Sequence, residues 1–311
     1  MTAGAGRVRT ERPKRPPATM KWIFSGVFAA IVLWSALTIE IEADRLLDLP
    51  AGLSNMFYLF FLRNGPDWTA LGGALDAMLE SVQIAWLGTI IGAILSLPMG
   101  FLGAKNVTSG LVSNVVRLVL NAIRAIPEIL VAVVVFIPMV GLGPYAGTLA
   151  IGVHSIGTLG KLSAEVVEGI DPGPVEAARA TGGRTFQVQR WGVLPQVLPE
   201  IVAFWLYRFE INVRASAILG AVGAGGVGEF LVQAINFRRY DRAGMAIIVV
   251  IVITILIDLA SGWVRRRIIE GGPGGPVDPE LQVALEDRAT ASMFIAGAAG
   301  ADGGAEGDDS S

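Results

Sequence analysis

The sequence predicts an all-α polytopic membrane protein with six transmembrane helices and with both the N and the C terminus in the cytoplasm. Of its 311 residues, 53% are hydrophobic and only 16% are charged, a balance too apolar for a soluble domain. The apolar residues form runs that reach the ~17 to 25 residues needed to cross a bilayer as a helix. Lys and Arg gather between alternate runs, as expected for segments that remain inside the cell.

The composition excludes several kinds of site. The chain has no cysteine, so neither disulfides nor thiolate chemistry can contribute. Its one histidine, His154, rules out a metal site built from several histidines of one chain. No GxxxxGK[ST] segment occurs, so this chain is not expected to bind ATP phosphates by that device. We therefore expect no metal and no cofactor in this chain.

Three segments differ in composition. Residues 1–21 are basic, contain several prolines and lack apolar periodicity, which predicts a disordered cytoplasmic tail. Residues 22–268 contain the apolar runs and form the predicted transmembrane domain. Residues 269–311 are acidic and rich in Gly and Ala, which predicts a second disordered cytoplasmic tail.

The apolar runs place the spans. The first, 22–39, lacks a convincing cleavage site and is interpreted as an anchor instead of a signal peptide. A short run at 53–62, rich in Met, Phe and Tyr, is expected to lie at the membrane interface. The other five spans are predicted at residues 78–102, 115–140, 145–166, 199–219 and 243–264.

Small and charged residues distinguish two of these spans. In the second, Gly88 and Gly92 lie four residues apart, a spacing that permits close approach of another helix. In the third, Arg124 and Glu128 are expected one helical turn apart around Pro127.

One loop disagrees with the distribution of basic residues. Arg238, Arg239 and Arg242 would lie outside the cell, between the last two spans. They are interpreted as a solvated loop, with anion steering or docking of a partner as the alternative. The topology is kept because every other segment agrees with it.

A polar stretch at 171–199 interrupts the apolar runs. Pro172 and Pro174 should stop a helix arriving from upstream, and Pro174 suits the first turn of a new helix. Glu176 is expected in that first turn, where a carboxylate favours the positive end of the helix dipole. Gly182 and the glycine after it should end the short helix by adopting positive φ angles.

A second short helix is expected in the same stretch. Thr185 can cap its start, and Leu194-Pro195 should close it. The result would be a helix-turn-helix whose first half carries small residues, including Ala177 and Ala178. Such a face can lie close against another protein.

The fifth span contains three charges, Arg208, Glu210 and Arg214. Charges inside a membrane are expensive and indicate either function or tight pairing. Glu210 and Arg214 are one turn apart and can pair, whereas Arg208 needs a partner on another helix or a ligand. An ion-pair network that only fixes the fold and an anion pathway both remain open, and the net positive charge of the three favours the pathway.

Two further polar residues are candidates for the same pathway. Ser216 follows the three charges, and His154 lies in the middle of the fourth span. A lone histidine there is more often a hydrogen-bonded packing residue than a ligand or proton relay. The candidate pathway residues are therefore Arg208, Glu210, Arg214, Ser216 and His154.

The glycine-rich segment from Gly223 to Gly228 matches the letters of a dinucleotide fingerprint. That fingerprint needs a strand before it and a helix after it in a soluble βαβ unit, whereas this segment ends a membrane span. Tight helix crossing or irregular backbone that lines a cavity is the better interpretation.

The polar stretch resembles the EAA loop of ABC importer permeases, on the residues Glu176, Ala177, Ala178, Gly182, Leu194 and Pro195 at the family's spacing. Gly192 stands where the general pattern has Ile, but it is similar to the phosphonate-type version, as are VRASAILGAVGAGGVG and RAIPEIL. The resemblance covers about 78–266. Permeases of methionine-type importers share the glycine-rich segment and remain the alternative family.

The resemblance implies a type I ABC importer permease fold in the bacterial plasma (inner) membrane. It implies import of phosphonate, phosphite or phosphate, with substrate delivered by an extracytoplasmic binding protein and with the chain acting as a homodimer. A separate ATPase would bind ATP and Mg and contact the chain at Glu176 to Gly182, so this chain would be a transport subunit and not an enzyme. A passive anion channel and an intramembrane enzyme that uses His154 and Glu210 are the rivals from other classes.

Overall fold

The computed structural model describes residues 18–38 and 43–270, and the chain divides into two compact units, Met1–Tyr58 and Leu59–Ser311. The first unit contributes α1 (Ala18–Thr38) and α2 (Ala43–Phe57). The apolar side chains of α1, such as Trp22 and Phe28, are exposed, as suits a helix that faces lipid. The predicted tails lie outside the described residues, except for 18–21 and 269–270, which belong to helices.

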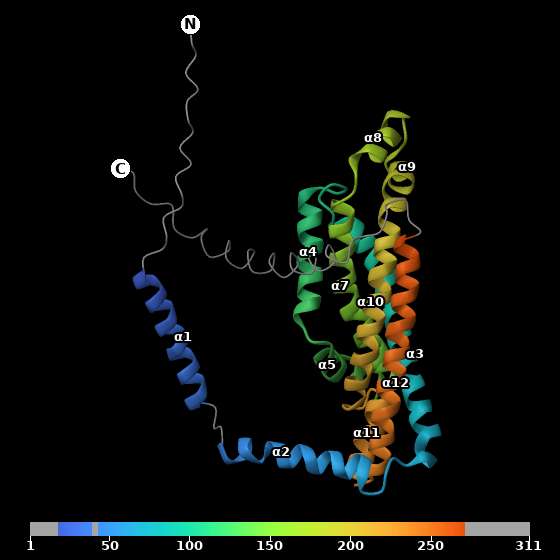
Figure 1. The fold of residues 1–311 in the computed structure, drawn as a ribbon. Coiled ribbons are helices and arrows are strands. Elements are labelled where there is room, and N and C mark those ends of the chain that lie inside the picture. The colour runs from blue at the N-terminus through green and yellow to red at the C-terminus, as the bar shows by residue number, and fades with distance from the viewer. Residues whose placement is uncertain (1–17, 39–42, 271–311) are drawn as a thin grey trace. The chain divides into compact units, whose positions relative to one another are not determined.

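The second unit is a bundle of helices, with no strand among its described residues (Figure 1). Its main helices and the short helical turns between them are, in chain order after the π-helical turn Tyr58–Leu62, η2 (Trp68–Ala70), α3 (Leu71–Gly103), α4 (Gly110–Ala125), α5 (Glu128–Leu130), η3 (Val131–Phe136), α6 (Ile137–Val140), α7 (Pro144–Glu168), α8 (Pro172–Ala180), α9 (Thr185–Val188), η4 (Gln189–Val193), α10 (Leu194–Gly220), α11 (Gly226–Asn236) and α12 (Tyr240–Glu270). Figure 1 shows α8 and α9 projecting from one end of the bundle, with α11 towards the opposite end.

Helices α3, α7 and α10 form the centre of this unit, and small residues allow them to approach closely. A Cβ placed on Gly88 would lie 2.7 Å from the Ile151 side chain, and one on Gly92 would meet Ser155. The predicted close approach at this glycine pair is therefore confirmed, and α7 is the partner. Buried side chains such as Met78 and Ile151 fill the remaining space.

Length and composition identify three described helices that could cross a membrane, Met20–Thr38, Trp68–Gly103 and Tyr240–Ile268, or four if a bent pair counts as one span. Helices α7 and α10 have 25 and 27 residues but contain more polar residues. Each of the six predicted ranges falls on one of these helices or on the bent pair, apart from residue 39, which lies outside the described residues. The prediction of an all-α polytopic membrane protein is confirmed.

The third predicted span is not one straight helix. Helix α4 ends at Ala125, and the chain bends by 80° before the segment Glu128–Val140. Pro127 explains the break, because it lacks an amide hydrogen and forces Ile126 into extended backbone, with φ −96° and ψ 120°. The expectation that Arg124 and Glu128 lie one helical turn apart is therefore wrong.

The glycine-rich segment forms the turn between α10 and α11, a helix that the sequence interpretation missed. Gly223, Gly225 and Gly226 have positive φ angles, and a Cβ on Gly228 would collide with the carbonyl oxygen of Ala217. These glycines allow α11 to fold back closely onto α10, which agrees with the predicted tight crossing. Val227 N fixes the turn to α3 by donating to Ser81 Oγ at 2.9 Å.

Candidate functional site

The polar stretch forms a compact helical projection that begins with α8. The Asp171 carboxylate accepts a hydrogen bond from Gly173 N at 2.9 Å and caps the helix, so that α8 begins at Pro172. Glu176 therefore lies in the second turn, and its expected place in the first turn is wrong. Pro172 is tolerated because the first helical position has no intrahelical partner for its amide.

The turn after α8 has the predicted positive φ angle at Gly182, but the same expectation for Gly183 is wrong. Gly182 has φ +80°, and its amide donates to Arg179 O at 2.9 Å. The Gly183 amide donates to Ala178 O at 3.3 Å, and a Cβ on Gly183 would lie only 2.7 Å from that oxygen. Both glycines are required by the backbone: the first by its φ angle and the second by close approach.

The second short helix differs from the prediction at both ends. Arg184 is its N-cap, not Thr185, and Arg184 N donates to Gln187 Oε1 at 2.8 Å. The helix does not close at Leu194-Pro195 but continues through the π-helical turn η4 directly into α10. Pro195 is the second residue of α10, and the chain passes through it as helix, so this proline does not end the helical path.

Gln196 and Gly192 tie the projection to α10. The Gln196 side chain accepts from Asp171 N at 3.1 Å and donates to Gly192 O at 2.5 Å, so it joins the start of α8 to η4. A Cβ on Gly192 would lie 3.1 Å from Val175 Cα, so glycine is what lets α8 lie against η4. The projection is thus a rigid extension of α10.

The outer surface of this projection is exposed and partly apolar. Glu176 and Ala177 are exposed, as is Pro195, while Ala178 and Leu194 are half-buried. Phe186 and Trp191 are 71% and 70% exposed, and the Arg190 guanidinium lies 5.6 Å from the Trp191 ring centroid. Large exposed apolar side chains at the tip indicate a surface for another protein.

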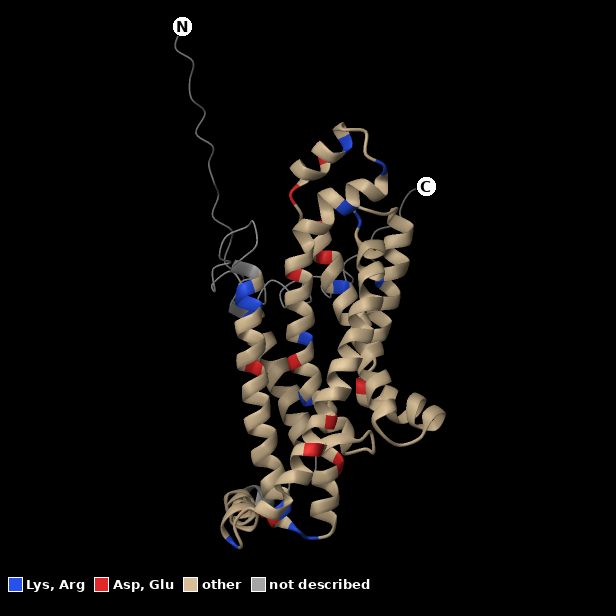
Figure 2. Cartoon of the chain, turned by 90° about the vertical axis from the view of Figure 1, so that its right-hand side faces the viewer, with Lys and Arg blue, Asp and Glu red and all other residues tan. Residues whose placement is uncertain are grey.

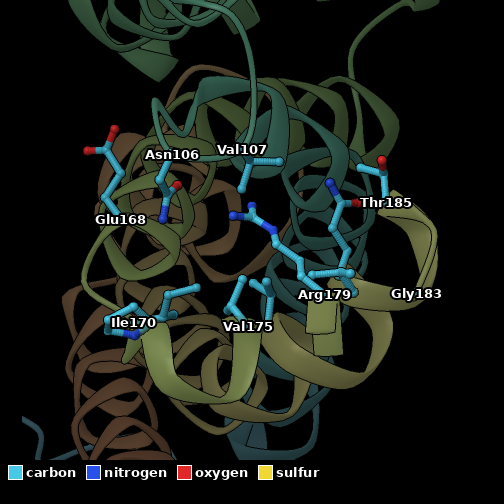
Figure 3. Close-up of a pocket in the computed structure, with 12 residues that line it drawn as sticks. Asn106, Val107, Glu168, Ile170, Val175, Arg179, Gly183 and Thr185 are labelled. Carbon is cyan, nitrogen blue, oxygen red and sulfur yellow. The ribbon is translucent and has the colours of Figure 1, made fainter. Parts of the chain in front are cut away.

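A cavity of about 430 Å³ lies behind the projection (Figure 3). Val107 from the α3–α4 loop and Val175 from α8 line it, and Arg179 points into it. At its edge, Glu168 Oε1 lies 2.7 Å from Arg117 Nη2 and accepts from Lys105 N at 2.7 Å. The base of the projection is thereby joined to α4 and to the α3–α4 loop.

The second candidate site is a cluster of polar side chains within the bundle, where Figure 2 shows charged residues along its length and not only at its ends. Arg208 on α10 is only 7% exposed. Its Nε donates to Ser155 Oγ at 3.2 Å, and its Nη2 lies 2.6 Å from His154 Nδ1. Its Nη2 also lies 3.8 Å from Glu128 Oε2 on α5. The partners of Arg208 therefore lie on other helices, as its sequence position predicted.

Two more residues complete this arrangement. Asn212, one turn after Arg208, donates through Nδ2 to Ser155 Oγ at 3.1 Å and to Thr89 Oγ1 at 2.8 Å. His154 Nδ1 lies 2.9 Å from Glu128 Oε2. We define the polar cluster as Thr89, Glu128, His154, Ser155, Arg208 and Asn212, from helices α3, α5, α7 and α10.

The other predicted pathway residues lie outside the polar cluster. Glu210 pairs with Arg265 of α12 at 2.7 Å, so its expected pairing with Arg214 is wrong. The reason is that α12 packs on this face of α10 and brings the half-buried Arg265 to it, whereas Arg214 is exposed. Ser216 is buried and donates to Val213 O of its own helix at 2.8 Å.

Sequence reasoning missed the roles of Glu128, Asn212 and Thr89. An amide one helical turn from Arg208 was a usable signal, because it shares a helix face with the arginine. Glu128 reaches the cluster only because of the 80° bend, which no local pattern encodes. Within the described residues, no group of three or more His, Asp or Glu is placed to hold a metal ion.

At the end of the bundle opposite the projection, Arg242 pairs with Asp67, so its interpretation as part of a merely solvated loop is wrong. Its Nε donates to Asp67 Oδ2 at 3.3 Å, and Asp67 N donates to Asp241 O at 3.2 Å. Asp67 also accepts from the hydroxyl and amide of Thr69, and these hydrogen bonds, with the nearby Arg242 charge, lower the pKa of the Asp67 carboxyl. This pair joins the start of α3 to the start of α12.

Comparisons with known proteins agree with this architecture. The phosphate-import permease protein PhnE of Mycolicibacterium smegmatis is 45% identical over 66% of this chain, which spans 38% of that relative. The phosphite transport system permease protein PtxC of Stutzerimonas stutzeri is 35% identical over 78% of this chain and 86% of its own length. A solved chain of the MetNI methionine ABC transporter, in inward-facing conformations, shares the fold with a TM-score of 0.55 at 23% identity, covering 61% of this chain and 93% of that one.

The family comparison covers most of the bundle, including the projection. Residues 92–270 match the family described as binding-protein-dependent transport system inner membrane component, and this range includes both the projection and most of the polar cluster. The match extends over more than half of the chain. The chain therefore belongs to the family of inner-membrane components of binding-protein-dependent transport systems and is a transport subunit with a type I ABC importer permease fold, not itself an enzyme.

Proposed function

We propose that this chain forms the membrane pathway of an ATP-driven importer for a phosphorus oxyanion, that is, phosphonate, phosphite or phosphate. The names of the two relatives support this substrate class. The observation that carries the proposal is Arg208, a guanidinium buried at the junction of three helices of a transport subunit.

The charge of the polar cluster suits an oxyanion. Arg208 contributes a permanent positive charge, and Arg124 lies close enough to act on it electrostatically. Arg124 also packs against Gly157, one turn of α7 beyond His154. Glu128 is the acidic member of this set, so the balance favours an anion. Methionine, the alternative substrate, is a zwitterion with no net charge, so the two arginines would attract it less than a phosphorus oxyanion.

The candidate pathway residues divide into two groups in this proposal. Arg208 and His154 belong to the pathway, and exposed Arg214 on α10 remains a candidate to guide the anion. Glu210 and Ser216 are assigned to helix packing, because one is paired with Arg265 and the other with its own helix.

The helical projection would receive mechanical work from a separate ATPase, which binds ATP and Mg. Its exposed surface around Glu176 and Ala177 is the proposed docking face, so this end of the bundle would lie in the cytoplasm. Both termini are proposed to be cytoplasmic as well. A substrate-binding protein would deliver the oxyanion on the other side. Two copies of the chain would enclose the pathway, since one bundle contributes one wall.

A single helix connects the two sites. Helix α10 continues directly from η4 at Leu194, and Arg208 lies 14 residues further along it, a rise of about 21 Å at 1.5 Å per residue. Because Gln196 and Gly192 fasten the projection to α10, movement of the projection would move Arg208 as part of the same rigid body. Rocking of α10 would then expose the polar cluster to alternate sides of the membrane.

Uptake competition tests this function. Cells that carry this chain, its ATPase and the binding protein should accumulate radiolabelled phosphate, and unlabelled phosphate, phosphite or alkylphosphonate should compete with it. Methionine should not compete. Competition by methionine alone would favour the methionine-type alternative, and uptake that persists with an ATPase unable to hydrolyse ATP would indicate a channel.

A further inference from the structure

His154 Nδ1 lies between a hydrogen-bond donor and a hydrogen-bond acceptor. It is 2.6 Å from Arg208 Nη2, which can only donate, and 2.9 Å from Glu128 Oε2, which accepts when ionised. One nitrogen cannot accept from the arginine and donate to the carboxylate at the same time. In the trio of Arg208, His154 and Glu128, Nδ1 can therefore accept from Arg208 when it carries no hydrogen, or donate to Glu128 when it does, but not both.

Glu128 differs from the other two members of the trio because it lies in a short, interrupted helical segment. It is the first residue of α5, a three-residue helix between the Pro127 break and the π-helical segment Val131–Phe136. π-Helical turns within a helix are frequent at functional sites. Arg208 and His154, in contrast, lie inside the long helices α10 and α7.

Glu128 also borders open space next to the polar cluster. A cavity of about 220 Å³ is lined by Pro127, Glu128, Ile129, Ala215, Ile218 and Leu219. Ala215 and Leu219 are 7 and 11 residues after Arg208, so they lie on the same face of α10. Glu128 is the charged residue among those that line this cavity, and Arg208 Nη2 lies 3.8 Å from its carboxylate.

Ser155 supplies a further donor to the trio. Its Oγ accepts from Arg208 Nε at 3.2 Å and from Asn212 Nδ2 at 3.1 Å, which uses both lone pairs of the hydroxyl. The Ser155 hydroxyl hydrogen therefore remains to be donated. The unprotonated oxygens of a phosphorus oxyanion are hydrogen-bond acceptors, so they would match this donor and the guanidinium together.

We propose that Arg208, His154 and Ser155 form an oxyanion site and that Glu128 is an internal anion that competes with the substrate for it. This inference rests on the proposed function and deepens it. When the oxyanion binds the guanidinium, two negative charges cannot share the position, and the Glu128 carboxylate leaves. Its departure moves α5 and opens the site toward the cavity, and its return helps to expel the oxyanion.

Binding to the assembled complex tests the competition directly. The chain and its ATPase, embedded in nanodiscs without the binding protein, are titrated with radiolabelled inorganic phosphate. Glu128→Gln removes the competing charge but keeps the size of the side chain, so the Kd for phosphate should fall about tenfold, which is about 1.4 kcal/mol. The maximal uptake rate of this variant should also fall, because release loses its internal competitor.

Two further variants complete the design. Glu128→Asp keeps the charge but shortens the reach to His154 and Arg208, so its Kd should fall in the same direction by a smaller factor. Arg208→Lys keeps the charge but loses the forked donors, so its Kd should rise at least about tenfold. The control is Asp67→Asn, which removes the carboxylate partner of Arg242 and should leave the Kd unchanged.

A purely structural role for Glu128 predicts the opposite pattern. If Glu128 only holds Arg208 in place, Glu128→Gln leaves a buried arginine without its partner, so complex assembly and thermal stability fall while the Kd stays constant or rises. An unchanged Kd in Arg208→Lys complexes that assemble normally would also overturn the inference. If Glu128→Gln does not assemble, the Glu128→Asp and Arg208→Lys results decide.

The outcomes separate the inference from the proposed function. If the wild-type complex with ATP and binding protein takes up phosphate, phosphite or methylphosphonate, and Glu128→Gln leaves the Kd unchanged, only the competing-anion inference is wrong. If the wild type takes up none of the three, the proposed function is wrong and the inference is overturned with it.

Discussion

Replacing Gly182 with valine is expected to uncouple ATP hydrolysis from uptake while leaving membrane insertion intact. Gly182 has φ +80°, and a Cβ at this position would meet nothing within 4 Å. The substitution therefore creates no collision. Its whole effect comes from the backbone, because L-residues with a side chain avoid the left-handed region and β-branched residues avoid it most.

The magnitude follows from this conformation. The left-handed region costs an L-residue roughly 1–2 kcal/mol, and valine should lie at or above the upper end. That cost reduces the population of the native turn about 5- to 30-fold relative to alternatives. The turn is closed by three amide hydrogen bonds, from Thr181 to Ala177 O, from Gly182 to Arg179 O and from Gly183 to Ala178 O. Opening it would reorient α8 relative to α9 and change the proposed docking face.

The assay compares uptake with ATP hydrolysis in the same proteoliposomes. The Gly182→Val complex should hydrolyse ATP but import several-fold less substrate per ATP than the wild type. Gly169→Ala is the matched control, because Gly169 precedes α8 just as Gly182 follows it. Gly169 has φ −86°, and a Cβ there would make ordinary contacts at 3.6 Å. If Gly182→Val imports as much substrate per ATP as Gly169→Ala does, the coupling role of this turn is refuted.

Three further predictions address other parts of the chain. Gly192→Ala places a Cβ 3.1 Å from Val175 Cα and should destabilise the projection by about 1–3 kcal/mol, seen as a lower thermal transition. Glu168→Gln weakens the ion pair with Arg117 of α4 and should lower the free energy of unfolding by about 1 kcal/mol or somewhat more, seen as a lower thermal transition. Hydrogen bonds from Thr69 lower the pKa of the Asp67 carboxyl. This carboxylate therefore stabilises the fold above its unfolded-state pKa of about 3.9, and the stabilisation is lost as the pH falls through the lower folded-state pKa. Thermal melts of Asp67→Asn should accordingly depend less on acid pH than those of the wild type.

Much of the bundle could be predicted because its signals are local. Apolar runs, the Gly88–Gly92 pair and the glycines that end α8 each depend on residues close together in the chain. The start of α10 was misplaced because a Leu-Pro pair is found both where a helix ends and where the next one begins, so Leu194-Pro195 alone does not distinguish the two cases. In the structure the chain continues as helix from η4 into α10. Gly192 packs closely against Val175 there, a contact that the local sequence does not specify.

The polar cluster was harder to predict because its contacts are not local. The burial of Arg208 in an apolar helix correctly indicated a partner on another helix. The identity of that partner depends on the bend at Pro127, which swings Glu128 toward α7. The pairing of Glu210 with Arg265 likewise depends on how α12 packs, so neighbouring letters on α10 suggested Arg214 instead.

The most direct test of the account is phosphate accumulation in proteoliposomes that contain the chain, its ATPase and the binding protein. The account predicts that radiolabelled phosphate, phosphite or methylphosphonate accumulates above its external concentration only when ATP is hydrolysed, and that Arg208→Lys reduces this accumulation. Flux that merely equilibrates the oxyanion without ATP, or accumulation of methionine but of no phosphorus oxyanion, would contradict it.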